Sequence, residues 1–390
     1  MRHGCDLNRR TLPALNVVAI GGVHQFPHFV PVACELAARG VMRVTVFVTS
    51  DGEAAMVRSL AARLNLPVPE IIEMRLPRSI ERAAGKSTSK LLRLIRWARR
   101  LRGGDAILCA ERTSTLLKRL PGRCPPLIHI PHGAGDRAVG FEPRFRFFDS
   151  VLVAGEKDRE RLIEQGVVAA ERCAVAGPIK VAALARCAAM APPLFDNDRL
   201  TLLYCPHFDA SLGSFAVFAD RLIERIAADP RYNLIVAPHI RLAGSWGEAQ
   251  RAEWVARSVP GKILVDPGSE RSTDMRYTLT ADLFIGDVSS QVYEFLVRPR
   301  PCLFIDAHGA DWQGNPDYAM WTLGEVVPPD CDIGAAVAQA FATHDRYRPL
   351  QEARVRRALD GLHWTADGGI AFDPDPIARA ASLIEGLIRR

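Results

Sequence analysis

Short apolar runs alternate with helical patterns along almost the whole chain, and this alternation constrains its fold more than any other feature. Apolar runs that end in polar or glycine-containing turns predict strands, and the amphipathic segments between them predict helices. Strands that alternate with helices form βαβ units with parallel sheets, so we expect an α/β protein with doubly wound sheets. The predicted strands are Asn16–Ile20, Arg43–Val48, Ile71–Met74, Ala106–Cys109, Leu127–Ile130, Ser150–Val153, Cys173–Val175, Thr201–Cys205, Asn233–Ala237, Ile263–Val265, Leu283–Ile285 and Cys302–Ile305.

The chain has 390 residues, which exceeds what one compact core usually supports, so two domains are expected. The segment 188–197, AAMAPPLFDN, contains prolines and lacks periodicity, as is typical of a linker. We therefore expect Rossmann-like domains over 1–187 and 198–370, with a last helix in 371–390 that packs back across the junction. Two such domains would face each other across a cleft, where ligands gather at the carboxyl ends of the strands.

The composition excludes several classes of protein. The net charge of +6 is modest, and no basic motif is interleaved with aromatic residues, so nucleic acid is not an expected partner. The nine cysteines are widely spaced and form no CxxC pair, which argues against a zinc site or disulfides and favours the cytoplasm. The apolar run at the N-terminus is short and leads into GGVHQF, so we interpret it as a strand and not as a signal peptide. No stretch has the length of a transmembrane helix.

The segment ADLFIGDVSSQVYEF combines a strand, a polar turn and the start of a helix. The hydroxyls of Ser289 and Ser290 and the unpaired N–H groups of a helix N-terminus suit a phosphate. Asp287 belongs to the same turn, and Glu294 lies one helical turn further on, placed to reach a donor hydroxyl. The alternative is an ordinary serine-capped helix.

The segment HIPHGAGDR places His132 and Gly133 directly after a predicted strand. A histidine there suits a general base that deprotonates an acceptor hydroxyl, because its ordinary pKa lies near neutral pH. The alternative is a loop histidine that hydrogen-bonds to the backbone. We add His24, after the first strand, and Asp136 as further candidates on the acceptor side.

Three other turns also follow predicted strands. His207 stands in LYCPHF, and His239 and Arg241 stand in APHIRL, where cationic groups suit the charge of a leaving nucleotide. Lys180 follows GPI and could reach a donor phosphate. Each of these residues could equally be an ordinary surface or capping residue.

The chain carries no Walker motif, no GxGxxG after the first strand and no GxSxG elbow. His24 and His28 flank Pro27, which interrupts the helix that an i,i+4 pair of metal ligands needs. We therefore expect no metal site and no cofactor, only a nucleotide-activated donor substrate.

Residues 86–102, KSTSKLLRLIRWARRLR, contain seven basic residues and no acidic one. A helix here would have an apolar face, made of Leu91, Leu94, Ile95, Ala98 and Leu101. Arg93, Arg96 and Arg100 would lie largely opposite. Such a helix either packs its apolar stripe on the core, the commoner case, or lies on an anionic membrane surface.

With these motifs in this order, the chain resembles the CDP-glycerol glycerophosphotransferase family over roughly residues 125 to 330. The resemblance rests on six matching segments, which are His132-Gly133, DSVLVAGEKDRERL, GPIK, LYCPHF, APHIRL and ADLFIGDVSS. It implies a GT-B fold. It further implies transfer of a glycerol-phosphate or related group from a CDP-linked donor to a polymer or lipid acceptor at the cytoplasmic membrane face.

The chain departs from the family pattern after its HG pair, after the proline of LYCP, and at Val288. We therefore expect a metal-independent transferase of cell-envelope biosynthesis with a CDP- or UDP-linked donor and a glycan or lipid acceptor. His132 would be the general base. His239 and Lys180 would face the leaving nucleotide. The alternatives are a UDP- or CMP-sugar glycosyltransferase, a UDP-sugar 2-epimerase of the same fold, or a non-catalytic binding protein.

Overall fold

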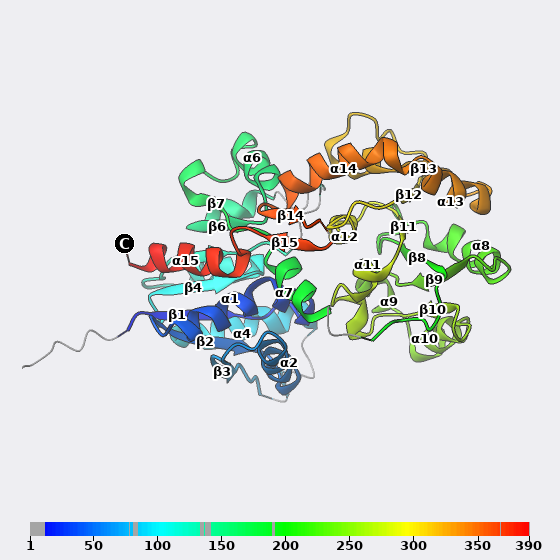
Figure 1. The fold of residues 1–390 in the computed structure, drawn as a ribbon. Helices are drawn as coiled ribbons and strands as arrows, with labels where there is room; N and C mark the ends of the chain where they lie inside the picture. Colours follow the sequence, from blue (N-terminus) through cyan, green and yellow to red (C-terminus); the bar gives the residue numbers. More distant parts are fainter. Residues whose placement is uncertain are drawn as a thin grey trace, which may run out of the picture.

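The computed structural model describes residues 12–77, 79–80, 85–132, 136, 142–188, 192–366 and 368–389. They form two lobes that lie side by side, each built on one parallel sheet flanked by helices (Figure 1). The α/β class and the two doubly wound sheets confirm the fold predicted from the sequence.

The first lobe contains a seven-stranded sheet in the order β3-β2-β1-β4-β5-β6-β7. Its strands are β1 (Ala14–Val18), β2 (Arg43–Val48), β3 (Glu70–Glu73), β4 (Ala106–Cys109), β5 (Leu127–His129), β6 (Ser150–Val153) and β7 (Cys173–Val175). Its helices are α1 (Phe26–Arg39), α2 (Asp51–Arg63), α4 (Lys86–Leu101), α5 (Leu116–Arg119), α6 (Glu156–Glu164) and α7 (Ile179–Ala188). Every strand pair is parallel.

The second lobe contains a six-stranded parallel sheet in the order β10-β9-β8-β11-β12-β13. Its strands are β8 (Leu200–Cys205), β9 (Tyr232–Val236), β10 (Ile263–Val265), β11 (Leu283–Gly286), β12 (Cys302–Ile305) and β13 (Glu325–Val327). Its helices are α8 (Phe215–Ala227), α9 (Ile240–Ala243), α10 (Glu248–Val255), α11 (Arg276–Thr280), α12 (Gln291–Phe295) and α13 (Ile333–Ala342).

Both sheets reverse their strand order next to the first strand of the lobe. In the first lobe β1 lies between β2 and β4, and in the second lobe β8 lies between β9 and β11. A crevice opens outside the carboxyl ends of the strands at such a switch point, and ligands bind there in open α/β sheets. The topology therefore places one such crevice in each lobe.

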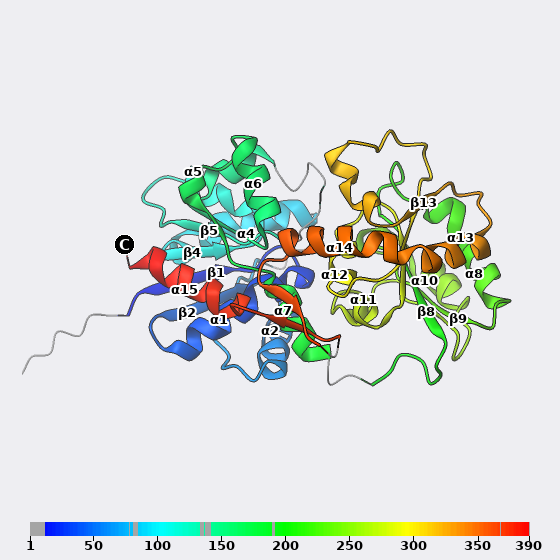
Figure 2. The ribbon, with the colours of Figure 1, turned by 45° about the horizontal axis from the view of Figure 1, so that its top comes forward.

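The last part of the chain returns to the first lobe. Helix α14 (His344–Ala358) extends from one lobe to the other (Figure 2) and contacts α6. A hairpin of β14 (Leu362–Trp364) and β15 (Ile370–Phe372) follows, and α15 (Pro376–Ile388) then packs on α1 and α7.

Helix α4 divides its predicted apolar stripe between the core and the surface. Leu94 and Leu101 are buried in the core of the first lobe, whereas Leu91 and Ile95 are 41 % and 52 % exposed. Arg93 was expected on the polar side, but it is buried. Its Nε donates to the carbonyl oxygen of Met74 at 3.1 Å. The prediction is wrong at these positions because the buried face centres on Leu94 and Leu101, about 60° or more away from Leu91 and Ile95.

Candidate active site

A cleft of about 300 Å³ lies between the two lobes and is lined by residues of both. Its walls include the segments that follow β1, β5, β8, β9 and β11, so it joins the switch-point crevices of the two sheets. The residues predicted from the sequence that line this cleft are His24, His132, Asp136, Lys180, His207, His239, Arg241, Ser289, Ser290 and Glu294. Asp287 is fully buried behind it. Gly133 lies outside the described residues.

His132 is held in one tautomer by the backbone. Its Nδ1 lies 3.1 Å from the carbonyl oxygen of Ala110, directly after β4. A carbonyl oxygen only accepts hydrogen bonds, so Nδ1 carries the proton and Nε2 of the neutral ring carries a lone pair. Burial lowers the pKa of His132 from its ordinary value, which keeps the ring neutral at pH 7. This is the state that a general base requires.

Sequence reasoning misses two residues beside His132. The amide Nε2 of Gln25 lies 3.5 Å from His132 Nε2 and donates to Oε2 of Glu111 at 3.2 Å. A Cβ at Gly21 would lie 1.8 Å from the amide oxygen of Gln25, so a side chain at position 21 would displace this amide. The glycine pair of GGVHQF is the signal that could have indicated this close approach.

His207 and His239 are held in the opposite tautomer. The backbone N–H groups of Asp209 and Arg241 donate to Nδ1 of these two rings, each at 3.1 Å. Because Nδ1 accepts, the proton of each neutral ring is on Nε2. Burial and the neighbouring His207 and Arg241 lower the pKa of His239 to about 4, so this ring is neutral at pH 7. The second lobe thus contributes ring N–H donors where the first lobe contributes a ring lone pair.

Phe208 was not among the predicted residues and completes an aromatic wall. Its ring lies 4.4 Å from that of His207 and 4.9 Å from that of His239, between centroids. The guanidinium of Arg241 lies 5.0 Å from the Phe208 centroid. This wall joins a flat apolar surface to a cation.

Asp287 positions the wall and does not line the cleft. Its Oδ2 accepts the backbone N–H groups of His207 at 2.8 Å and Ser214 at 2.9 Å. Among the described residues, its Oδ1 has no hydrogen-bond partner. Burial raises the pKa of Asp287 to about 6.

Helix α12 differs from the helix expected after the serine pair. It has five residues, and the N–H groups of Gln291, Val292 and Tyr293 already donate to Ser289 Oγ, Ser289 O and Ser290 O. The expected set of unpaired N–H groups is therefore not present at these three positions, because the turn uses them. The hydroxyls of Ser289 and Ser290 still line the cleft.

Lys180 and Glu294 pair with each other across the cleft. Lys180 Nζ of α7 lies 2.6 Å from Glu294 Oε1 of α12, and both side chains are mostly buried. The sequence suggests separate roles for them on the donor, but in this structure each neutralises the other and connects the lobes.

Two further predicted residues, His24 and Asp136, also line the cleft. His24 faces His132 with 6.0 Å between ring centroids, and burial, followed by His132, lowers its pKa to about 4. Asp136 is 1 % exposed and bound by side chains of both lobes. Within the described ranges, no group of three or more His, Cys, Asp or Glu side chains could hold a metal ion. No described helix is long and apolar enough to cross a membrane.

No protein-family model and no curated protein matches the sequence. Solved structures resemble it in fold over nearly its whole length. The UDP-GlcNAc 2-epimerase of Neisseria meningitidis bound to UDP-GlcNAc has 13 % identity and a TM-score of 0.57, over 97 % of this chain and 100 % of that chain. The S. aureus MnaA–UDP structure has 13 % identity and a TM-score of 0.62, over 97 % of each chain.

The wall teichoic acid polymerase TagF is similar to the same extent. It has 11 % identity and a TM-score of 0.61, over 97 % of this chain and 89 % of that chain. At such identities the likeness concerns the fold alone. The two facing Rossmann-like lobes, the strand orders and these likenesses together confirm that the chain has the GT-B fold.

Proposed function

We propose that this protein is a transferase that moves a glycerol-phosphate or glycosyl-type group from a nucleotide-diphosphate donor to a hydroxyl of a cell-envelope glycan or lipid. The donor would be CDP-glycerol or a related CDP- or UDP-linked compound. The observation that supports this best is the fixed tautomer of His132, whose Nε2 lone pair belongs to a neutral ring at the cleft between two switch points.

In the proposed reaction, His132 Nε2 accepts the proton of the acceptor hydroxyl as the oxygen attacks the donor. In glycerol-phosphate transfer the new bond forms to the β-phosphorus, and the bond from that phosphorus to the bridging oxygen breaks, so that CMP leaves. In glycosyl transfer the nucleoside diphosphate leaves instead. The Nε2–H groups of His207 and His239 and the guanidinium of Arg241 would stabilise the charge that develops on the leaving phosphate.

In this proposal, the pair of Lys180 and Glu294 binds the donor. A donor phosphate would compete with the Glu294 carboxylate for Lys180, and a donor hydroxyl would then find Glu294 as an acceptor. Ser289 and Ser290 would bind the same donor beside this pair.

The test starts with a screen of CDP-glycerol, UDP-sugars and CMP-sugars by thermal shift, followed by turnover with the donors that bind. His132→Ala should lower turnover by about 10²- to 10⁴-fold and leave donor binding within a factor of about two. His363→Ala, at an exposed histidine of β14 that does not line the cleft, serves as the control. Unchanged turnover by His132→Ala would contradict the proposal, and no turnover with any donor would favour a non-catalytic binding protein.

A UDP-sugar 2-epimerase is a second candidate, favoured by the fold likeness to the Neisseria and S. aureus proteins. Inversion at C2 requires loss and return of the C2 proton, so UDP-GlcNAc incubated in D₂O without acceptor would take up deuterium at C2. The transferase predicts no exchange, and proton NMR of the sugar distinguishes the two.

We also propose that helix α4 brings the enzyme to an anionic membrane surface, where a lipid-linked acceptor would lie. The exposed Leu91 and Ile95 are flanked by the exposed Arg96, Arg99 and Arg100, a pattern that suits acidic lipid headgroups. Leu91→Gln with Ile95→Gln should abolish flotation with phosphatidylglycerol vesicles and leave the fold intact. Val217→Gln, equally exposed at 52 % in the other lobe, is the control. Equal flotation of both variants would contradict this role.

A further inference from the structure

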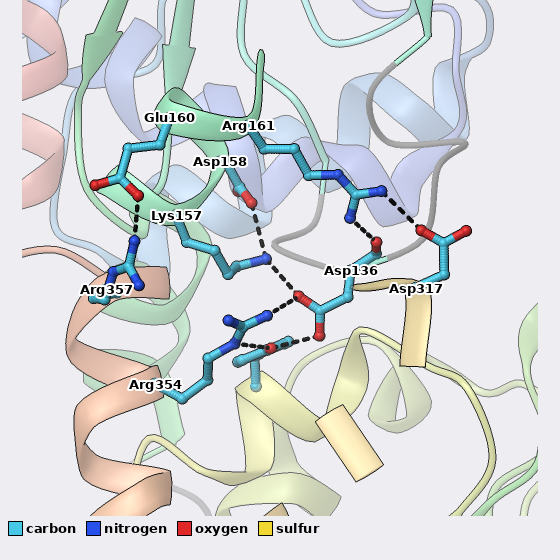
Figure 3. A network of polar contacts seen from close by, with 9 residues as sticks. Asp136, Lys157, Asp158, Glu160, Arg161, Asp317, Arg354 and Arg357 are labelled. Atoms are coloured by element: carbon cyan, nitrogen blue, oxygen red, sulfur yellow. Dashed lines mark hydrogen bonds and ion pairs between the residues drawn. The ribbon is translucent and has the colours of Figure 1, made fainter. Parts of the chain in front are cut away.

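Asp136 is the centre of a buried polar network that joins the lobes (Figure 3). Its Oδ1 accepts from Lys157 Nζ at 3.0 Å and from the Arg354 guanidinium at 2.9 Å. Its Oδ2 accepts from the Tyr293 hydroxyl at 2.6 Å, and that hydroxyl in turn accepts from Arg354 Nε at 3.1 Å. We call these four residues, Asp136, Lys157, Tyr293 and Arg354, the Asp136 network.

The network is balanced in charge and largely removed from water. Asp136 is 1 % exposed and Lys157 is 8 % exposed, and Lys157 Nζ also lies 2.9 Å from Asp158. Two carboxylates therefore face two cations. Loss of one partner in such a buried set leaves an uncompensated charge, so the intact network is favoured over a partly broken one.

The network connects elements that are far apart in the sequence. Lys157 is on α6 of the first lobe, Tyr293 on α12 of the second, and Arg354 on α14, which spans both. Arg161 of α6 additionally donates to the backbone carbonyl of Asp136 and to Asp317 Oδ1. Both the side chain and the main chain of Asp136 are thus held in place.

Asp136 also lies close to the proposed base in the sequence. Only three residues separate it from His132, so the two Cα atoms are at most roughly 14 Å apart. Both residues line the cleft. Tyr293, which holds Asp136, is on the same short helix that follows Ser289 and Ser290.

We propose that Asp136 is a positioning residue: with Tyr293 and Arg354 it holds the two lobes together, and this keeps His132 opposite the histidines of the second lobe across the cleft. This inference rests on the proposed function. It replaces the expectation that Asp136 binds the acceptor, because its carboxylate already accepts from three side chains.

The chain offers a matched control for this role. Arg357 of α14 pairs with Glu160 of α6, so this pair joins the same two helices on the exposed side without contact to Asp136 (Figure 3). Arg357→Gln therefore reports on loss of a cross-lobe ion pair alone. Tyr293→Phe is the mildest probe of the network, because it removes one hydroxyl and keeps the ring beside Lys157. Arg354→Gln and Asp136→Asn are stronger probes.

In the full-length protein, Tyr293→Phe should lower kcat by about 10- to 100-fold and change the dissociation constant of the donor by less than about twofold. Amide hydrogen exchange of the peptide that contains His132 and Asp136 should become faster. The acid limb of the pH–rate profile should move to higher pH, since a less buried imidazole regains an ordinary pKa. The other titratable groups that act on His132 are unchanged in these variants; they are Glu111, Arg112, Arg241, His24, His28 and His129.

Arg357→Gln should change none of the three readouts. The inference is overturned if Tyr293→Phe and Asp136→Asn match Arg357→Gln in kcat and exchange while His132→Ala is inactive. If His132→Ala remains active, the proposed function fails instead, and the exchange measurement still shows whether the network holds the segment.

Discussion

Both lobes place histidines directly after strands at the cleft but give them opposite chemistry. His132 follows β5 in the first lobe, and His207 and His239 follow β8 and β9 in the second. A backbone carbonyl faces Nδ1 of His132, whereas backbone N–H groups face Nδ1 of the other two rings. The result is a lone pair on one side of the cleft and N–H donors on the other.

The difference shows that one residue type serves two tasks because of the backbone group beside it. A ring whose Nε2 carries a lone pair suits proton abstraction, and rings whose Nε2 carries the proton suit an anionic leaving group. Burial keeps His132 and His239 neutral, so the backbone, and not the solution pH, sets which atom carries the proton. Four experiments test this comparison.

The largest effect is expected when His132 is replaced by a neutral amide. His132→Gln and His132→Asn should each lower kcat by about 10²- to 10⁴-fold, because neither amide accepts a proton at neutral pH. Steady-state kinetics with the donor identified by screening measures this loss. If either variant retained more than a tenth of the activity, His132 would not be the general base.

Asp287 supports the second lobe's rings, and its ionisation should affect stability. Its folded pKa of about 6 lies above the ordinary value of 3.8, so its contribution to stability is present at low pH and is lost as the pH rises through 6. Asp287→Asn should therefore gain stability relative to the native protein by about 2 kcal/mol between pH 4 and pH 8. Urea unfolding at both pH values measures this change, and a constant difference would argue against it.

His239 offers a smaller and more selective test, because its two nitrogens have separate roles. Glutamine can place an N–H near the Nε2 position, and asparagine can keep the acceptor that receives the Arg241 N–H. His239→Asn should weaken donor binding by about 1 to 2 kcal/mol, whereas His239→Gln should retain most of it and lose about 1 kcal/mol of stability. Calorimetry measures donor binding, and thermal unfolding measures stability. The assigned tautomer would be rejected if His239→Gln bound the donor more weakly than His239→Asn, or if His239→Asn were the less stable of the two.

The smallest effect is expected at Gln25, whose amide lies between Glu111 and His132 Nε2. Gln25→Met should lower kcat several-fold, because the contact to the ring is long at 3.5 Å and contributes less than about 1 kcal/mol. Gly21→Ala should act similarly, since its Cβ would displace the same amide. If Gly21→Ala is neutral in kinetics while Gln25→Met is not, the glycine has no role in placing the amide.

The fold and the rough location of the site follow from the sequence. All twelve predicted strands are present, because apolar runs between turns have few other ways to be buried in a doubly wound sheet. The strands β13, β14 and β15 were missed, since each has three residues and only half-buried or mixed positions. Most predicted site residues line the cleft, because they follow parallel strands whose carboxyl ends share one edge.

What each side chain does in the cleft depends on atoms that come from elsewhere in the chain. The tautomer of His132 depends on Ala110, the pairing of Lys180 depends on Glu294, and the pairing of Asp136 depends on Arg354. The sequence thus determined a two-lobed α/β chain with polar groups at its strand ends. Only the tertiary structure decided which of these groups accept, donate or hold the lobes together, because hydrogen bonds and charge pairing act over a few ångströms between residues that the sequence separates widely.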